Sequence, residues 1–389
     1  MKKTLAAVAV LGAFAGSAIA ADVTLYGIVD MGLDYNHIDM DGYNNLDDKD
    51  SFAMDSGNQS GSRWGIKGTE ELGNGLTVGF ILEDGFDADD GTEDSSGVMF
   101  NRESSLFIEG GFGKLAFGRI GSVNNGQSSW ALAGRLSAFG TSFSNLSAQA
   151  GNIFSMAEQW DNMIAYATPS FAGFKVYAQY AMGNTADGAV ENESSSDRYY
   201  AIAATYDNGP FGGYLAVDSR NYKSWYADVE GGAASAHDTD DSLTVTLGLS
   251  YDFDVAKVYF GAQYYDEVTI RSMGGIFDDQ YSSFTDIANS KIKGYSLSLS
   301  ADAPLAGGKG MFGVGYIDGS AADSETDNNG TDFDFTRWVV SVGYDYPLSK
   351  RTNIYGVASY MNDKYDPDGN NEEVNPSSYG LMIGMRHKF

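Results

Sequence analysis

The last ten residues, Gly380–Phe389, constrain the fold of this chain more than any other segment. Leu381 and Ile383 share one parity along the chain, whereas Gly384 and Arg386 share the other. In a β-strand, this alternation places large apolar side chains on one face and small or charged side chains on the opposite face. An apolar outer face and a polar inner face are typical of a strand in a membrane β-barrel. For this segment alone, the alternative interpretation is the amphipathic final strand of a soluble β-sandwich.

The first twenty residues predict a signal peptide, so we expect 1–20 to be removed and 21–389 to form the folded domain. Lys2 and Lys3 precede an apolar run at Leu5–Ala15, and Ala18-Ile19-Ala20 offers a cleavage pattern of small residues. The run is too short for a membrane-spanning helix, and an uncleaved anchor is the alternative. Removing the two lysines changes the formal net charge from −29 to −29 − 2 = −31.

No later apolar run approaches the ~18 residues that a transmembrane helix needs. An exported chain of this kind either dissolves in the periplasm or medium, or spans a membrane as a closed barrel, because backbone polar groups in hydrocarbon must be paired. Abundant glycine (49), tyrosine (25) and phenylalanine (22), with only 6 prolines, favour strands and tight turns over helices.

The composition also argues against several functions. The chain has no cysteine and its 3 histidines are widely separated, so we expect neither a disulfide framework nor a metal site. The excess of 53 acidic over 24 basic residues argues against nucleic acid as a partner. Gly308–Gly313 matches a dinucleotide-binding motif but precedes a strand rather than a helix, and no serine lies in a nucleophile-elbow motif. The sequence therefore predicts no catalytic residue, no cofactor and no enzyme.

Segments with a two-residue period alternate with turns along the whole chain. Short connections are predicted at 72–75, 110–113, 208–211, 253–254, 303–309 and 347–350, and long polar ones at 37–59, 84–99, 183–197, 221–241, 268–290, 318–334 and 362–377. Short turns at one rim and long loops at the other are typical of outer-membrane barrels. The pattern predicts an all-β transmembrane antiparallel β-barrel of about sixteen strands, a size that leaves an aqueous channel.

The connection between Arg119 and Asp161 differs from the other long loops, because it has almost no acidic residue before Glu158. It contains scattered large apolar side chains, among them Trp130 and Phe139. A loop exposed to solvent does not need such residues, whereas a loop folded inward against the barrel wall does. We therefore expect this third loop to fold into the barrel. A surface loop that packs on a neighbouring subunit is the alternative.

Two other long loops, 84–97 and 318–334, each contain six carboxylates. Solvation of exposed loops accounts for such clusters. They also fit a negative vestibule that concentrates cations, or carboxylates bridged by divalent ions to lipopolysaccharide phosphates. The sequence leaves these interpretations open.

Basic residues are predicted on the inner wall. The neighbours of Arg63 and Lys67 have the lipid-facing parity, so both cations point inward, while Arg102 opens the strand 102–108 with an ambiguous parity. An inward arginine is tolerated in a water-filled lumen but not in the apolar core of a soluble sandwich. The alternative is that these arginines are paired structurally with wall carboxylates such as Glu83.

Seven segments, in the same order along the chain, resemble one known family, the trimeric general diffusion porins of β-proteobacteria, which include the neisserial porins. The segments are Val23–Gly27, Gly61–Leu76, Phe100–Arg102, Phe112–Arg119, Asp161–Pro169, Leu348–Tyr355 and Gly384–Phe389. The resemblance implies a sixteen-stranded barrel, a homotrimer, and a third loop that forms an eyelet opposite basic wall residues.

The resemblance also implies where the eyelet residues lie. Arg63 and Arg102 match two of the basic positions of the family, and Lys67 follows on the same inner face. A third arginine of the family falls on Gln159 here, next to Glu158, which weakens the positive charge of the eyelet. Arg135, within the loop, is the candidate that partly restores it.

These observations predict an outer-membrane porin of a Gram-negative bacterium, a passive water-filled channel for ions and small hydrophilic solutes. We expect it to contact outer-membrane lipid and lipopolysaccharide. A structural or adhesive barrel with a closed lumen, whose acidic loops bind a surface partner, is the alternative. An outer-membrane enzyme ranks third, because no catalytic constellation is present.

Overall fold

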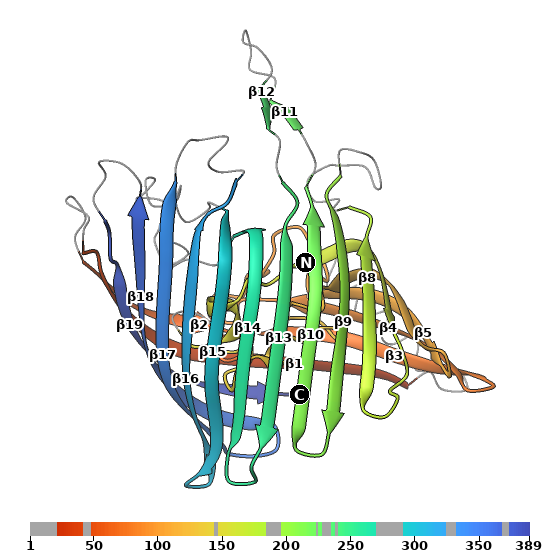
Figure 1. The fold of residues 1–389 in the computed structure, drawn as a ribbon. Helices are drawn as coiled ribbons and strands as arrows, with labels where there is room; N and C mark the ends of the chain where they lie inside the picture. Colours follow the sequence, from red (N-terminus) through yellow and green to blue (C-terminus); the bar gives the residue numbers. More distant parts are fainter. Residues whose placement is uncertain are drawn as a thin grey trace.

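A single antiparallel sheet closes into a barrel in this computed structural model, which describes residues 22–41, 48–143, 147–183, 196–222, 225–227, 235–237, 240–269, 291–323, 332–367 and 373–389 (Figure 1). The strands of the sheet are β1 (Asp22–Asp39), β2 (Lys49–Ser56), β3 (Arg63–Gly73), β4 (Leu76–Gly85), β5 (Glu103–Gly110), β6 (Gly113–Gly121), β7 (Gln159–Ala167), β8 (Phe174–Ala181), β9 (Arg198–Asn208), β10 (Phe211–Asn221), β13 (Leu243–Asp252), β14 (Lys257–Val268), β15 (Ile292–Leu305), β16 (Gly308–Ala321), β17 (Phe333–Pro347), β18 (Thr352–Pro367) and β19 (Ser377–Lys388).

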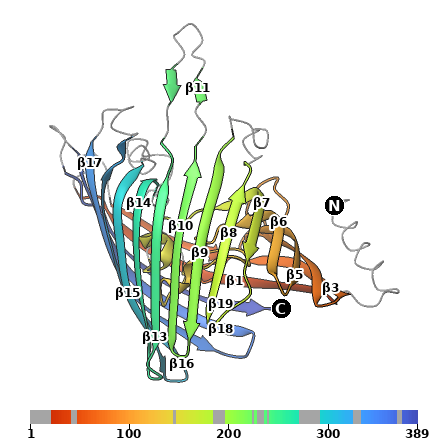
Figure 2. The same cartoon turned by 45° about the vertical axis from the view of Figure 1, so that its right-hand side comes forward.

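Two short helical segments and one small hairpin complete the described elements. A 3₁₀ turn, η1 (Ala133–Arg135), and a single helical turn, α2 (Ala150–Ile153), lie in the third loop. The hairpin of β11 (Trp225–Ala227) and β12 (Ser235–His237) rises above one rim of the barrel (Figures 1 and 2). Among the described residues, no helix is long and apolar enough to cross a membrane.

The 17 strands of the sheet occupy sixteen positions in the barrel wall, which confirms the predicted strand number. β1 pairs with β3 along its first half and with β2 along its second half, so β2 and β3 share one position and 17 − 1 = 16 remain. The break between them, 57–62, is held by Asp30. Its carboxylate accepts backbone hydrogen bonds from Gln59 at 3.0 Å and Ser60 at 2.6 Å.

The last strand closes the barrel as its alternation predicts. β19 pairs with β1 in twelve antiparallel residue pairs. Leu381, Ile383 and Met385 are each 52% exposed, whereas Met382, between them, is 2% exposed. The apolar side chains of β19 therefore form part of the outer surface, and the opposite parity faces the lumen.

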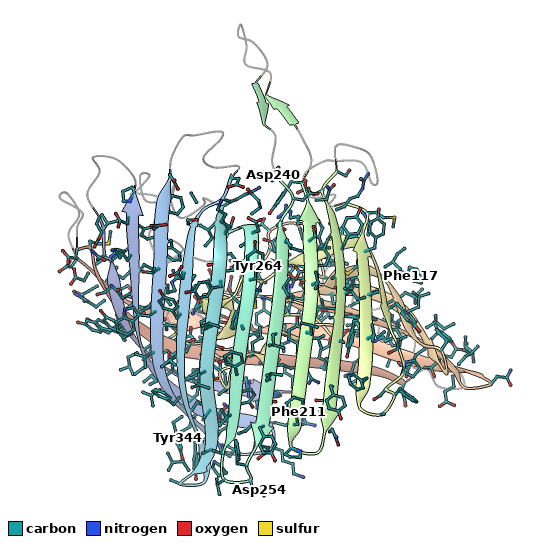
Figure 3. The ribbon with its side chains drawn as sticks, in the orientation of Figure 1. Phe117, Phe211, Asp240, Asp254, Tyr264 and Tyr344 are labelled. Atoms are coloured by element: carbon teal, nitrogen blue, oxygen red, sulfur yellow. The ribbon has the colours of Figure 1, made fainter. Side chains whose placement is uncertain are left out.

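Aromatic side chains are present on the outer surface toward both rims. Figure 3 shows Phe211 and Tyr344 toward the rim that carries Asp254, and Tyr264 toward the rim near Asp240. Aromatic belts of this kind mark the two membrane interfaces of a transmembrane barrel.

One rim consists of short turns, and most of the predicted turns fall between consecutive strands. β15 and β16 extend further than predicted and leave only Ala306 and Gly307 between them, and a further short connection lies at 168–173. The prediction of one continuous loop at 37–59 is wrong, because 49–56 pairs with β1 and forms β2. The predicted loop at 221–241 contains the β11–β12 hairpin.

The third loop lies inside the barrel, as its composition predicts. Its apolar residues Leu136, Phe139 and Phe143 belong to one buried cluster with Val339 and Tyr355 of the barrel wall. The largest buried cluster of the described residues therefore joins this loop to the inner wall, where a soluble sandwich would have a core between two sheets.

Candidate functional site

Two guanidinium groups and a carboxylate meet on the inner wall of β3–β5. Arg102 Nε donates to Glu83 Oε1 at 2.8 Å, and Arg63 Nε lies 3.5 Å from Glu83 Oε2. Tyr26 donates its hydroxyl to the same Oε2 at 3.0 Å. The predicted alternative, in which the arginines pair with Glu83, is thus correct in its geometry. Two cations share one anion, so the group keeps a positive charge.

Amide side chains connect this group to the third loop. Gln127 Oε1 accepts hydrogen bonds from Arg102 Nη1 at 2.9 Å and from Gln159 Nε2 at 3.0 Å. Gln159, at the start of β7, therefore lies one side chain away from Arg102. Gln127 carries no sequence signal of its own, because an uncharged residue in a loop is not distinguished by parity or spacing.

Three further cations lie on the same part of the inner wall. Lys67 Nζ lies 5.0 Å from the ring centroid of Tyr26, which also contacts Glu83. Arg386 and Lys388 on β19 interact electrostatically with Arg63. Their inward parity is readable from the last strand, but their proximity to Arg63 depends on the closure of the barrel. We call Arg63, Lys67, Arg102, Arg386 and Lys388 the basic wall.

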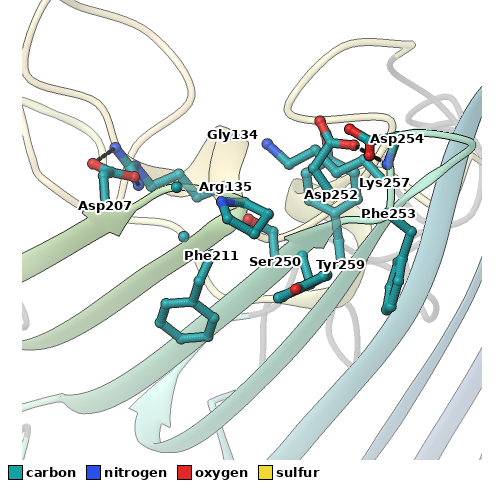
Figure 4. A pocket seen from close by; sticks show the side chains of 14 residues that line it. Gly134, Arg135, Asp207, Phe211, Ser250, Asp252, Phe253, Asp254, Lys257 and Tyr259 are labelled. Carbon is teal, nitrogen blue, oxygen red and sulfur yellow. Dashed lines mark hydrogen bonds and ion pairs between the residues drawn. The ribbon is translucent and has the colours of Figure 1, made fainter.

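Arg135 lies elsewhere, against the wall formed by β9 and β10. Its Nη1 and Nη2 donate to the two carboxylate oxygens of Asp207 at 2.8 and 3.0 Å, and this hydrogen bonding raises the pKa of Arg135 above its usual value. Figure 4 shows this pair at one side of an 860 Å³ pocket near the short-turn rim, with Asp252, Asp254 and Lys257 at the other side. The charge of Arg135 is therefore compensated locally.

Glu158 is exposed near the end of the third loop. Its backbone carbonyl accepts a hydrogen bond from Ser122 at 3.2 Å, and its carboxylate interacts electrostatically with Arg220. Arg220 also pairs with Asp197 at 2.7 Å and lies 5.1 Å above the ring of Trp160. The structure thus brings Arg63, Lys67, Arg102 and Gln159 together, and it places Glu158 and Arg135 with other partners.

Wall hydroxyl groups fix the far side of the loop. The backbone amide of Ala138 donates to Ser300 Oγ on β15 at 2.9 Å, and that of Ala148 donates to Ser341 Oγ on β17 at 2.7 Å. Together with the Gln127–Arg102 contact, these bonds show that the loop crosses the lumen from the β5 wall to the β15–β17 wall.

The arrangement suits the passage of ions. In the part of the chain that the structure describes, no three His, Asp or Glu side chains are grouped to hold a metal ion. The loop narrows the diameter of the lumen, and the fixed charges on the wall create an electrostatic field there. Both act on a passing solute.

A closed barrel with an apolar outer wall, aromatic belts and a charged lumen defines the class of outer-membrane channels. Residues 6–366 match the Gram-negative porin family. The chain belongs to this family, and it is a passive channel of the Gram-negative outer membrane.

Named relatives agree with this assignment. The chain is 33% identical to an outer membrane porin protein of Bordetella pertussis and 27% identical to the major outer membrane protein P.IB of Neisseria sicca, each over the full length of both chains. Among solved structures, it is similar to the anion-selective porin from Comamonas acidovorans, with a TM-score of 0.64, 26% identity, and coverage of 95% of this chain and 100% of that one. The predicted resemblance to β-proteobacterial and neisserial porins is confirmed.

Proposed function

We propose that the basic wall and the third loop form the eyelet that sets the ion selectivity of this channel. In this eyelet the uncharged Gln159 lowers the positive charge. The contacts that run from Glu83 through Arg102 to Gln127 and Gln159 carry the proposal, because they tie the charged wall to the loop. Any ion that passes between wall and loop there meets guanidinium groups at short range.

Two sets of charges compete for control of selectivity. The acidic loops dominate the net charge of residues 21–389, −29 − 2 = −31, but their carboxylates at the mouth are screened beyond a Debye length of ~8 Å at physiological salt. The basic wall acts over shorter distances, where screening is weaker. Because Glu83 neutralises part of the basic wall and Gln159 is uncharged, we infer weak selectivity at high salt and a shift toward cations as salt is lowered.

The solved relative from Comamonas acidovorans is described as anion-selective. We infer a weaker anion preference in this chain, because the family resemblance places an arginine where Gln159 stands. Arg135 does not supply the missing charge at that place in our proposal, since its carboxylate partner is Asp207.

Reversal potentials in a tenfold KCl gradient, measured at two mean concentrations, test this proposal. Gln159→Arg should move the reversal potential toward anions, and Arg63→Ala should move it toward cations. Glu158→Gln serves as the control for a charge change in the loop that leaves the basic wall intact. A strong anion preference that persists at low salt in the unmodified protein would contradict the proposed weakness of the eyelet.

We further propose a homotrimer that contacts lipid and lipopolysaccharide, passes small hydrophilic solutes and catalyses no reaction. The resemblance to trimeric porins supports the oligomer, and the absence of a catalytic motif in the sequence supports the last point. The proposed signal peptide, residues 1–20, lies outside the described residues; mass spectrometry of the exported protein would show whether it begins at residue 21.

A further inference from the structure

The outer wall has a groove of 670 Å³ where β15–β18 approach the short-turn rim. Its origin is the strand register, which places Ala303, Gly310, Tyr344 and Gly356 in one row across the four strands. Three of these four residues have no atom beyond Cβ, so only Tyr344 contributes a large side chain to the row. In the next row, β18 contributes Ala358, whose small side chain also leaves space in the groove.

Tyr344 does not fill the groove. Its hydroxyl donates to the carbonyl oxygens of Leu305 at 3.0 Å and Ala306 at 3.2 Å, which hold the ring toward the turn. Beside it, a Cβ at Gly356 would have its nearest neighbour, a methyl carbon of Ile383, at 3.6 Å, an ordinary contact distance. The space over Gly356 is therefore open, and packing within the chain does not require a glycine there.

The turns beneath the groove are basic. Lys309, Lys350 and Arg351 are exposed there, and the segments 305–309 and 347–351 contain no carboxylate. By contrast, the turns below β9–β10 and β13–β14 contain carboxylates, namely Asp207 at the end of β9 with Asp252 and Asp254. A phosphate at this rim is thus favoured under the groove and less favoured under the adjacent wall of β9–β14.

We propose that this groove binds an acyl chain of a glycerophospholipid, whose phosphate lies at Lys350 and Arg351. The groove opens on the surface that faces hydrocarbon, where an apolar cavity is filled by lipid chains rather than by water. The short-turn rim of such barrels faces the periplasm. The groove and the cations therefore lie at the depths of the acyl chains and the phosphate of a phospholipid in the periplasmic leaflet.

Native mass spectrometry tests the proposal on the full chain, purified in mild detergent and mixed with dipalmitoyl-phosphatidylglycerol. Ala358→Leu fills the groove, and the same change at Ala178 is the matched control, because Ala178 is exposed on the outer face of β8 in another part of the wall. We expect Ala358→Leu to lower the fraction of protein that retains the lipid several-fold, and Ala178→Leu to leave it unchanged. Heat-modifiable electrophoretic mobility establishes that each variant is folded, and Gly356→Leu replaces Ala358→Leu if the latter is not.

The role of the phosphate is tested with dipalmitoylglycerol, which has the same acyl chains but no phosphate. The unmodified protein should retain several-fold less dipalmitoylglycerol than phosphatidylglycerol, and Lys350→Gln combined with Arg351→Gln should abolish the difference. Equal retention of phosphatidylglycerol by Ala358→Leu and Ala178→Leu would overturn the proposal. So would a loss of oligomer in Ala358→Leu alone, because a second copy of the chain would then be the occupant of the groove.

Discussion

Arg337 on β17 and Asp363 on β18 form a two-point ion pair under the third loop, with Nε and Nη2 each 2.6 Å from a carboxylate oxygen. The two side chains are 1% and 0% exposed. The remaining nitrogen, Nη1, donates to the carbonyl of Asn152 in α2 at 3.2 Å. This buried ion pair therefore connects the third loop to the barrel wall.

Removing one partner of this pair should be more harmful than removing both. Asp363→Ala removes the carboxylate that accepts from Nε and Nη2 of the buried Arg337 guanidinium, which costs about 3–5 kcal/mol. We expect that loss in the free energy of unfolding, together with noisier single-channel currents as the loop loosens. Replacing both residues by leucine should restore much of the stability. Equal unfolding midpoints in urea for the single and double variants would contradict this role of the pair.

The wall serines should hold the loop more weakly and independently of each other. Ser300→Ala or Ser341→Ala leaves a buried backbone amide of the loop, at Ala138 or Ala148, without an acceptor, at a cost of about 1–3 kcal/mol. Hydrogen exchange at that amide should become faster. Ser296→Ala is the control, because Ser296 lies on β15 but makes no hydrogen bond to the described part of the loop. Unchanged exchange in both variants would show that apolar packing alone fixes the loop.

Glu83 should lower the positive electrostatic potential of the eyelet. Glu83→Gln keeps the size of the side chain but removes the anion shared by Arg63 and Arg102. The reversal potential in a KCl gradient should then move toward anions, and the shift should be larger at low salt, where screening is weaker. Glu109→Gln, at the short-turn end of β5, controls for a change of one unit in net charge. A shift of the same size in both variants would mean that the position of Glu83 is unimportant.

The inward loop was predictable from the sequence, whereas most of its contacts were not. The lack of acidic residues and the presence of Trp130 and Phe139 indicate burial, and the structure buries both. The acceptors on Ser300 and Ser341 come from strands more than 150 residues away, with separations of 162 and 193. A strand pattern gives the parity of a residue but not its height relative to a distant loop, so these pairs could not be assigned.

The same limit applies to the basic wall. Parity predicts that Arg63 and Lys67 face inward, and pairing of the arginines with a wall carboxylate such as Glu83 is the alternative. Arg386 and Lys388 could be placed inside by parity alone, but their meeting with Arg63 depends on the register at which β19 closes on β1. The sequence suggests Arg135 as an additional positive charge of the eyelet, because it does not show that η1 places this side chain against Asp207.

Phe389 should contribute to closure of the barrel. Its backbone amide donates to the carbonyl of Gly27 at 3.0 Å, and the ring packs over Gly27, where an added Cβ would lie 2.3 Å from the ring. Deleting Phe389 removes both contacts, so we expect a lower yield in outer-membrane fractions while export across the inner membrane continues. Ile383→Ala, on the outer face of the same strand, is the control for a lost apolar side chain. Equal yields of the deletion and the unmodified protein would contradict this expectation.

Single-channel conductance in a planar bilayer tests the central claim most directly. If the barrel is a water-filled channel narrowed by the third loop, the unmodified protein gives stepwise currents that increase with salt concentration. Deletion of Ser137–Gln149, which removes the part of the loop bound to Ser300 and Ser341, should then raise the step size markedly in a folded oligomer. Absence of current steps in the unmodified protein, or equal steps after the deletion, would contradict the account.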